Sequence, residues 1–571
     1  MEKNLTAPGQ GGARRHGPMV VPRSAPVNAV VNALLNAAVN VVAGAAVAAA
    51  VPCAALAQAR AANPAAPAPM ATPAPSPHFT IRGFKVTGDN PLGEGETARV
   101  LAPFLRADAT IDTLQQATAA LEAELRRRGY GLHRVALPPQ EVGDTVTLNI
   151  VTFTIDKVVI EGRKIYDEGN IRRTVPELQE GRTPNFRKLA IQTAIANENP
   201  NKQIQVGIRE ADEPDKINAA ITVKEEKPWT FGLGASNGGT KASGEDRVTL
   251  TAGHTNLWDL DHQIVAAYTT SLERTSDVKQ FGLAYKIPLY QLGGVIGASY
   301  TKSDVVGNFG AFTSTGAGHT FGLSYTHYFE PDGGRRSYLT VGLDDKVFKG
   351  TVINGIPIGI DRRSAPLTLG YTARTETDTY VFGYDIALSA NTGVGSHNDL
   401  FSYQSEYAGI DTTSFKVLRG AVSYVAPFAT SWAWNLRGTY QFSPDPLISG
   451  EQFGLGGLGS VRGTTIDRPI SGDSGAAVTF EVTTPEFTEG LRALGFVDAG
   501  WISNNRSDGV QRLSSDHLAS AGVGLRYAKG QFAATADYGR IIEGSRMPLT
   551  TNSAAPKRGD DRFYVNLSVK F

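Results

Sequence analysis

The second half of this sequence, from Trp229 to Phe571, consists of alternating apolar and polar residues in sixteen separate segments, with no helix of useful length between them. Successive side chains of a strand point to opposite faces, so each segment offers one apolar and one polar face. The even count and the repeated pattern predict a transmembrane β-barrel of sixteen antiparallel strands, with lipid outside and a wet lumen inside. The last segment, Arg562 to Phe571, places an aromatic residue at the carboxyl terminus of the chain. We expect it to pair with the segment at Trp229 and to close the barrel.

The sixteen segments were located from their alternation and from the turn residues between them. They cover residues 229–237, 246–255, 261–271, 277–287, 293–302, 319–329, 336–347, 365–374, 379–388, 413–426, 432–443, 475–484, 490–502, 515–528, 531–542 and 562–571. Short connections alternate with long ones, and the longest runs from Ser443 to Ser474. Short turns at one rim and long loops at the other are typical of outer-membrane barrels. A soluble sandwich with an exposed edge strand, the alternative, has no reason to keep this parity.

The amino-terminal region indicates export from the cytoplasm. Residues 27–51 carry no charge and follow three arginines, and the small-x-small triplet Ala57-Gln58-Ala59 comes next. This order of a charged, an apolar and a small-residue region predicts a signal peptide over residues 1–59, with Met19 as an alternative start. An uncleaved inner-membrane anchor is the alternative interpretation. Residues 60–77 are almost all Ala and Pro and are interpreted as a linker.

Composition excludes several classes of function. The only cysteine, Cys53, lies inside the predicted signal peptide, so the exported chain has no thiol for a disulfide or a metal site. Without residues 1–59 the chain keeps 51 basic and 54 acidic residues, and this balance does not favour a nucleic-acid partner. Beyond the signal peptide no apolar run is long enough for a transmembrane helix, so any membrane role falls to β-structure.

Two similar units separate the linker from the strand array. The first, residues 78–153, opens with a strand ending in Gly88, continues with a helix whose apolar residues recur every three or four positions, and ends with two strands. The second, residues 154–226, repeats that order and has Gly162 where the first has Gly88. Each unit is therefore predicted to be a small β-α-α-β-β domain. The barrel is assigned to residues 227–571.

Two motifs with a chemical association are better explained by turns and loops. Residues 454–459 match the pattern G-x-G-x-x-G, but no strand-turn-helix context for a dinucleotide surrounds them. His254, Asp259, Asp261 and His262 contain metal-ligating atoms, but they bracket a short turn in which polar residues are expected. No motif of nucleophilic, metallohydrolase or nucleotide chemistry occurs. We therefore predict neither an enzyme nor a metal or cofactor site.

One constellation links the longest loop to the strands after it. Val461, Arg462, Gly463 and Thr464 lie within the loop, and alternation places Phe496, Asp498 and Gly500 on the lumen face of a later strand. An arginine on a loop folded into the lumen would satisfy Asp498 with bidentate hydrogen bonds. An exposed arginine and a solvated aspartate are the alternative, and from physical chemistry alone this alternative is favoured.

A resemblance reverses that preference. The tandem domains, the sixteen-strand array, the V-R-G loop, the F-x-D strand and terminal Phe571 together resemble the two-partner secretion transporters (TpsB, haemolysin secretion/activation proteins) with two POTRA (polypeptide-transport-associated) domains. The resemblance covers residues 79–571. It implies that the loop dips into the barrel and that Arg462 pairs with Asp498, and we add Glu481, which alternation places in the lumen, as an accessory. Thr464 departs from the family, which usually has an aromatic residue there. The family's plug helix has no visible counterpart in residues 60–77.

The resemblance implies an outer-membrane transporter of a Gram-negative bacterium, with its POTRA-like domains in the periplasm. Its expected partner is a large secreted exoprotein of β-helical type, captured unfolded on an exposed sheet edge of these domains and passed through the barrel. Phe571 would be the terminal signal read by the barrel-assembly machinery, and outer-membrane lipid surrounds the barrel. The alternatives are a factor that inserts other barrel proteins into the outer membrane and a passive pore or receptor.

Overall fold

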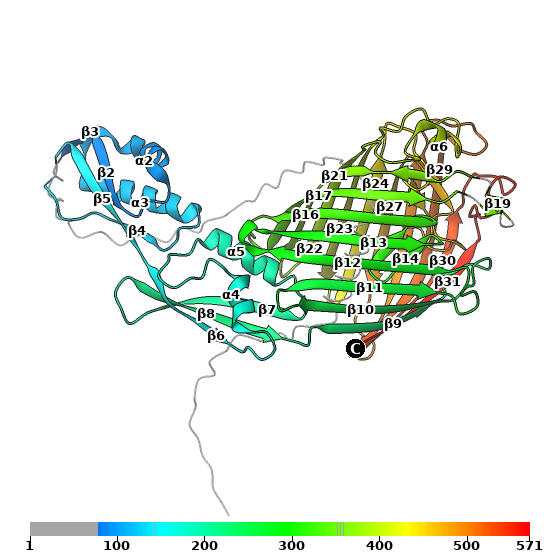
Figure 1. Ribbon diagram of the computed structural model, residues 1–571, viewed down its shortest axis with the longest axis horizontal. Helices are drawn as coiled ribbons and strands as arrows, with labels where there is room; N and C mark the ends of the chain where they lie inside the picture. The colour runs from blue at the N-terminus through cyan, green and yellow to red at the C-terminus, as the bar shows by residue number, and fades with distance from the viewer. Residues whose placement is uncertain (1–77, 142, 351, 354–355, 358) are drawn as a thin grey trace, which may run out of the picture.

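The computed structural model describes residues 78–571, apart from positions 142, 351, 354, 355 and 358 (Figure 1). Two small α+β domains precede one large barrel, and the chain enters the barrel from the side on which the domains lie. The predicted signal peptide, the predicted linker and Cys53 lie outside the described residues. None of the helices within the described ranges is both long and apolar enough to cross a bilayer.

The first domain is a three-stranded sheet covered by helices. Its elements are β1 (Phe79–Ile81), β2 (Gly83–Gly88), α2 (Gly93–Leu101), the 3-10 turn η1 (Ala102–Phe104), β3 (Arg106–Ala109), α3 (Ile111–Arg127), β4 (His133–Ala136) and β5 (Thr145–Thr152). The sheet order is β2-β5-β4, with β2 parallel to β5, and β1 pairs separately with β3. Leu114, Leu121 and Leu125 of α3 are buried in the core with Leu148 and Ile150 of β5. The sequence did not predict the β1–β3 pair, because strands this short carry almost no alternation.

The second domain repeats this layout. It contains β6 (Thr154–Glu161), α4 (Glu168–Thr174), α5 (Phe186–Ala196), β7 (Lys202–Glu210) and β8 (Lys216–Glu225), in the sheet order β6-β8-β7. Gly88 and Gly162 both adopt a positive φ, +87° and +83°, and a Cβ on either would collide with a carbonyl of the adjacent parallel strand. A glycine is therefore required at both positions, which is the physical reason for the repeated motif.

The barrel is closed and antiparallel, as predicted. Its strands are β9 (Trp229–Ser236), β10 (Arg247–Leu257), β11 (His262–Thr270), β12 (Lys279–Leu289), β13 (Gly294–Ser303), β16 (Gly318–Tyr328), β17 (Arg335–Phe348), β20 (Arg362–Ser364), β21 (Pro366–Glu376), β22 (Val381–Asn391), β23 (Lys416–Phe428), β24 (Trp432–Phe442), β27 (Ser474–Thr483), β28 (Leu491–Ser503), β29 (Ser515–Lys529), β30 (Phe532–Glu543) and β31 (Asp561–Lys570). β20 and β21 are separated only by Ala365 and both pair with β17, so they form one strand position and the total is sixteen. Each predicted segment overlaps one observed strand.

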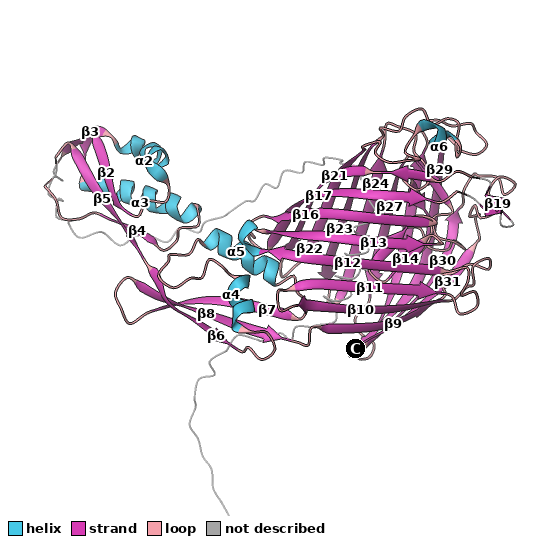
Figure 2. Ribbon diagram, viewed as in Figure 1, coloured by secondary structure: helices cyan, strands magenta, loops and turns pink. Residues whose placement is uncertain are grey.

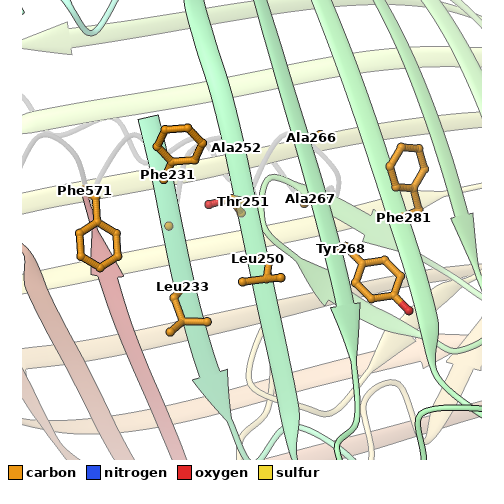
Figure 3. Close-up of a pocket in the computed structure, with 11 residues that line it drawn as sticks. Phe231, Leu233, Leu250, Thr251, Ala252, Ala266, Ala267, Tyr268, Phe281 and Phe571 are labelled. Atoms are coloured by element: carbon orange, nitrogen blue, oxygen red, sulfur yellow. The ribbon is translucent and has the colours of Figure 1, made fainter. Parts of the chain in front are cut away.

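Strand β31 closes the barrel against β9. Its residues Asn566 to Lys570 pair with Ser236 to Gly232, and the backbone N–H of Phe571 donates to the carbonyl of Phe231 at 2.8 Å. The outer surface beside this seam is apolar, and a groove of about 540 Å³ crosses β9 to β12 there (Figure 3). Leu250, Tyr268 and Phe571 line it, and each is more than 40% exposed. Lipid-facing apolar side chains next to the seam are what the alternation of the terminal segment predicted.

The two rims of the barrel differ. The rim beside the second domain, here called the proximal rim, has short turns, including the 3-10 turn η2 (Tyr290–Leu292). The opposite, distal rim carries long loops with their own elements (Figure 2). These are β14 (Gly307–Phe309), β15 (Phe312–Ser314), β18 (Val352–Ile353), β19 (Ile356–Pro357), α6 (Leu400–Gln404), β25 (Phe453–Leu455) and β26 (Ile470–Gly472). Two of the distal loops do not stay at the rim but run into the lumen.

Candidate functional site: a loop held inside the barrel

Strand β28 presents alternate side chains to the lumen. Phe496 and Asp498 are 4% and 0% exposed, whereas Val497 and Trp501 on the other face are 50% and 47% exposed. Gly500 also faces inward, and a Cβ there would overlap Leu455 of strand β25. The lumen face of β28 is therefore a contact surface for another part of the chain.

The segment that contacts this surface is the connection between β24 and β27, residues 443–473, here called the lumen loop. Strands β25 and β26 pair within it, and between them the chain forms a tip at Val461 to Thr464. Val461, Arg462 and Thr464 are at most 3% exposed. The G-x-G-x-x-G stretch starts on β25 and runs into this tip with no helix after it, as the sequence interpretation held.

Arg462 is the central side chain of the tip. Its Nε donates to Asp498 Oδ2 and its Nη2 to Asp498 Oδ1, both at 2.8 Å, and its backbone N–H donates to Oδ2 at 3.1 Å. The guanidinium also lies over the Phe496 ring, 3.3 Å from the ring centroid. A bidentate pair fixes both the position and the orientation of the arginine. The structure thus brings together Arg462, Asp498 and Phe496 of the sequence constellation.

Two further carboxylates surround the guanidinium. Glu481 on β27 accepts from Arg462 Nη1 at 2.8 Å, and Asp537 on β30 does so at 3.4 Å. Arg437 approaches Glu481 to 3.2 Å, and Arg526 approaches Asp537 to 2.8 Å. The site therefore balances three acidic groups with three basic ones on five strands and one loop. Charges buried in this way are tolerated because each is paired and hydrogen-bonded.

The tip reaches the terminal strand of the barrel. The hydroxyl of Tyr564 on β31 accepts from Gly463 N–H at 3.1 Å and donates to the Thr464 carbonyl at 2.9 Å. Gly463 has a φ of +107°, and a Cβ there would lie 3.0 Å from the Gly539 carbonyl oxygen. Thr464, where the family usually has an aromatic residue, is 1% exposed and donates its hydroxyl to the Ile466 carbonyl.

Sequence reasoning missed Asp537 and Tyr564. Asp537 follows Ala536 and precedes Tyr538 on β30, and it is 2% exposed while Tyr538 is 39% exposed. Alternation alone places Asp537 in the lumen, so the signal was present, but several other polar lumen positions carry the same signal. Alternation along the last segment also places Tyr564 on the lumen face, but nothing local indicates its contact with a tip 101 residues away in sequence.

The base of the lumen loop is anchored by two buried carboxylates. Glu451 accepts from Ser364 Oγ at 2.7 Å and from Arg419 at 2.8 Å, and pairs with Lys346 at 3.1 Å. Asp473, also buried, accepts backbone N–H groups from Leu447 and Asn505, both at 2.9 Å. These contacts attach the loop to strands β17, β20 and β23 and to the loop after β28.

A second buried ion pair joins the second domain to the barrel. Lys202 on β7 donates its Nζ to Asp261 Oδ2 at 2.5 Å, and both side chains are at most 2% exposed. Tyr290 and Asn170 complete the cluster, since Tyr290 donates to the same carboxylate oxygen and Asn170 accepts from Lys202, both at 2.8 Å. Burial lowers the pKa of the Lys202 ammonium below its ordinary value, and the Asp261 carboxylate works against that shift.

This ion pair also explains the polar cluster at the turn after β10. Asp261 is bound to Lys202, the ring of His262 contacts the Tyr285 hydroxyl at 2.7 Å, and His254 Nδ1 accepts from Asn256 N–H at 3.2 Å. Among the described residues, no three His, Cys, Asp or Glu side chains are arranged to hold a metal ion. The polar residues of this turn fix the domain to the proximal rim.

Comparisons with known proteins agree with this architecture. Residues 79–152 match the model of the ShlB-type POTRA domain. The outer membrane transporter CdiB of Escherichia coli is 25% identical over 477 residues, covering 80% of this chain and 77% of CdiB, and CdiB of Dickeya dadantii is 21% identical over 457 residues. The solved structure of E. coli CdiB covers 87% of this chain and 91% of its own, with a TM-score of 0.69 at 21% identity. CdiB of Acinetobacter baumannii gives a TM-score of 0.66 at 17% identity, with 87% and 90% covered.

More than half of the chain, residues 215–527, matches the family model of the haemolysin secretion/activation protein ShlB/FhaC/HecB. Members of this family are outer-membrane transporters of two-partner secretion, which work with a secreted exoprotein, and their POTRA domains lie in the periplasm. The proximal rim is therefore the periplasmic rim and the distal rim the extracellular one. On this match, together with the closed sixteen-stranded barrel, the chain belongs to the ShlB/FhaC/HecB family of haemolysin secretion/activation proteins.

Proposed function

We propose that this protein captures one large, unfolded exoprotein in the periplasm and passes it through the barrel lumen to the cell surface, and that the lumen loop must change position for this passage. The observation that carries the proposal is the attachment of the loop. The lumen contains a segment that is joined to the wall through side chains and not through continuous strand pairing. A segment attached in this way can leave the wall without opening the barrel.

Capture is assigned to the edge strands of the two periplasmic sheets. In the second domain the edge strand β7 is nine residues long. At Ile204 its outward-pointing backbone groups are already bound by Asn197, whose side chain accepts from the Ile204 N–H and donates to the Ile204 carbonyl. By the same alternation the backbone groups of Val206 and Ile208 point outward at this edge, and Ile208 is 37% exposed. An extended exoprotein segment would add to this edge as a further strand, with affinity supplied by backbone hydrogen bonds.

Arg462 is assigned the role of the lock that holds the lumen loop in its resting position. Three carboxylates from three different strands converge on it. The tip is therefore fixed in place only when these three strands lie side by side in the closed barrel. The lock is polar, and water that enters the lumen during transport can hydrate its separated charges. Hydration of these charges lets the loop leave its resting position without energy from a nucleotide. The sequence contains no nucleotide-binding motif.

Deletion of the gene tests the function. We expect one large exoprotein to disappear from the culture medium while the abundance of other outer-membrane barrels stays unchanged. An unchanged set of secreted proteins would refute the proposal, and a fall in many outer-membrane proteins at once would favour an assembly factor instead. Arg462→Ala tests the assignment of the lock: we expect the barrel to insert while secretion is lost, and normal secretion by this variant would refute the assignment.

A further inference from the structure

A second distal loop also enters the lumen. The connection between β13 and β16 contains the short hairpin β14–β15, in which Phe309 pairs with Phe312 at the turn. The two rings are stacked, with centroids 5.7 Å apart, and they are 2% and 6% exposed. An eight-residue hairpin cannot bury two phenylalanines by itself, so the burial comes from the barrel wall. Residues 307–314 are here called the aromatic hairpin.

The wall under the aromatic hairpin is a recess built from small residues. Thr251 on β10 is the direct cross-strand partner of Ala267 on β11, which in turn is paired with Gly282 on β12. A Cβ on Gly282 would overlap the Phe312 ring, and the ideal Cβ position at Gly310 lies 2.8 Å from the Ala267 Cβ. Three neighbouring strands thus have small residues at one level of the barrel, where the hairpin occupies the space that larger side chains would fill.

The aromatic hairpin also touches the lumen loop. Arg468 of the loop donates its Nη1 to the Thr315 carbonyl just after the hairpin at 3.5 Å, and its Nη2 to the carbonyl of Gln452 within its own loop at 2.5 Å. On the other side of the hairpin, the Cβ position of Gly307 is 3.9 Å from Asp467 Oδ2. The tip of the loop lies on β27 to β31 and the hairpin on β10 to β12, so the two segments flank the β31–β9 seam.

We infer that the aromatic hairpin is a second plug of the lumen, and that it must leave its recess on β10 to β12 before an exoprotein can pass. This inference rests on the proposed export function. The hairpin is held mainly by two apolar side chains in a recess of small residues. Once the hairpin has left, these small residues would present no bulky side chain to a passing chain.

A reversible cross-link tests whether the hairpin has to move. In the variant carrying Gly282→Cys and Phe312→Cys, the two sulfurs lie where the Phe312 ring now meets the wall at Gly282, so that they can form a disulfide. Cys53 is the only other cysteine of the full chain. We expect the oxidised pair to abolish secretion and a reductant to restore it, while either single cysteine secretes in both conditions. Continued secretion with the cross-link fully formed would overturn the inference.

A measurement that needs no exoprotein separates the plug from the export function. In planar lipid bilayers we expect the double variant Phe309→Ser and Phe312→Ser to conduct more than the wild-type protein, and the increase to be larger when Arg462→Ala also releases the lumen loop. Val306→Ser is the matched control, because Val306 lies in the same loop but is 39% exposed. Unchanged conductance in both backgrounds would overturn the plug, whereas a failed gene-deletion test with increased conductance would refute only the export function.

Discussion

The lumen loop and the aromatic hairpin occupy the same lumen but are held by different forces. The tip of the lumen loop is fixed by Arg462, which meets Asp498, Glu481 and Asp537 in directional, charge-assisted hydrogen bonds. The hairpin is fixed by two phenylalanine rings in a recess of small residues. The first attachment demands one geometry and fails when a single partner is lost. The second tolerates small displacements, because apolar burial has no preferred direction.

The difference indicates which segment sets the state of the pore. A polar lock holds its loop in one register or not at all, whereas an apolar plug can slide and return. The lock joins three strands of the terminal half of the barrel, while the hairpin touches the strands on the other side of the seam. We therefore expect mutations in the lock to release the loop completely and mutations in the hairpin recess to displace the hairpin only in part.

The largest effect is expected from removing one partner of the lock. Asp498→Ala leaves the Arg462 guanidinium without its bidentate acceptor in a site that is 3% exposed, and breaking a buried ion pair destabilises by about 3–5 kcal/mol. The tip should detach, which labelling of a cysteine introduced at Thr464 with a membrane-impermeant maleimide will detect. Arg437→Ala is the matched control, because the Arg437 side chain is 41% exposed and contacts Glu481 alone within the site. Equal labelling of the two variants would contradict the distinction between lock and periphery.

The ion pair between Lys202 and Asp261 is the comparison for the lock, because it is a buried charge pair that does not have to open during transport. It joins the second domain to the periplasmic rim, where no movement is assigned. Lys202→Met alone should destabilise the junction by about 3–5 kcal/mol, and adding Asp261→Leu should recover most of that, since buried pairs can often be replaced by apolar residues of similar size. The measurement is the rate of limited proteolysis of the second domain in the intact protein, which rises when the junction between domain and barrel is weakened.

The corresponding apolar replacement in the lock, Arg462→Met with Asp498→Leu, is the comparison for that experiment. We expect it to keep the loop in the lumen and to block secretion, because water cannot hydrate an apolar contact when the loop should leave. Secretion at the wild-type level by this double variant would show that the charges of the lock serve only stability.

How far the sequence predicted these sites depends on the range of the interaction. Alternation within a strand is local, so it placed the sixteen strands, the lumen face of Phe496 and Asp498, and the lumen position of Glu481. The approach of Arg462 to Asp498 was expected only from the family resemblance, because no local rule says where a loop of 31 residues goes.

The aromatic hairpin could not be predicted for the same reason. The segments predicted at 293–302 and 319–329 leave a long connection between them, and nothing in Phe309 or Phe312 indicates that this connection turns inward. The complementary signal lies elsewhere, in Thr251, Ala267 and Gly282, which become one recess only when three strands are placed in register. Small residues in alternating strands are common, so the recess has no signature in a single segment.

Gly282→Val tests the graded behaviour of the hairpin. The added side chain would overlap the Phe312 ring, and overpacking of this kind costs about 1–3 kcal/mol. We expect partial displacement of the hairpin, seen as a moderate rise in conductance with the lumen loop still protected from labelling. Gly495→Val is the control, since a Cβ at Gly495 has no atom within 4 Å. Loss of loop protection in Gly282→Val would mean that lock and plug are a single unit.

The smallest effect is expected from Tyr564→Phe. The substitution keeps the ring but removes the hydroxyl that accepts from Gly463 N–H and donates to the Thr464 carbonyl, and each such hydrogen bond contributes about 0.5–1.5 kcal/mol. The ion pairs of Arg462 remain, so the tip should stay in place and secretion should persist, with only a faster rate of maleimide labelling at a cysteine placed at Thr464. Tyr538→Phe on the neighbouring strand is the matched control, because it too removes a hydrogen-bonded tyrosine hydroxyl, here the one that donates to Asp561, but on the outer face of the barrel. Because Tyr564 belongs to the strand that closes the barrel, an unchanged labelling rate in Tyr564→Phe would show that the tip is held by charge alone and is independent of the seam.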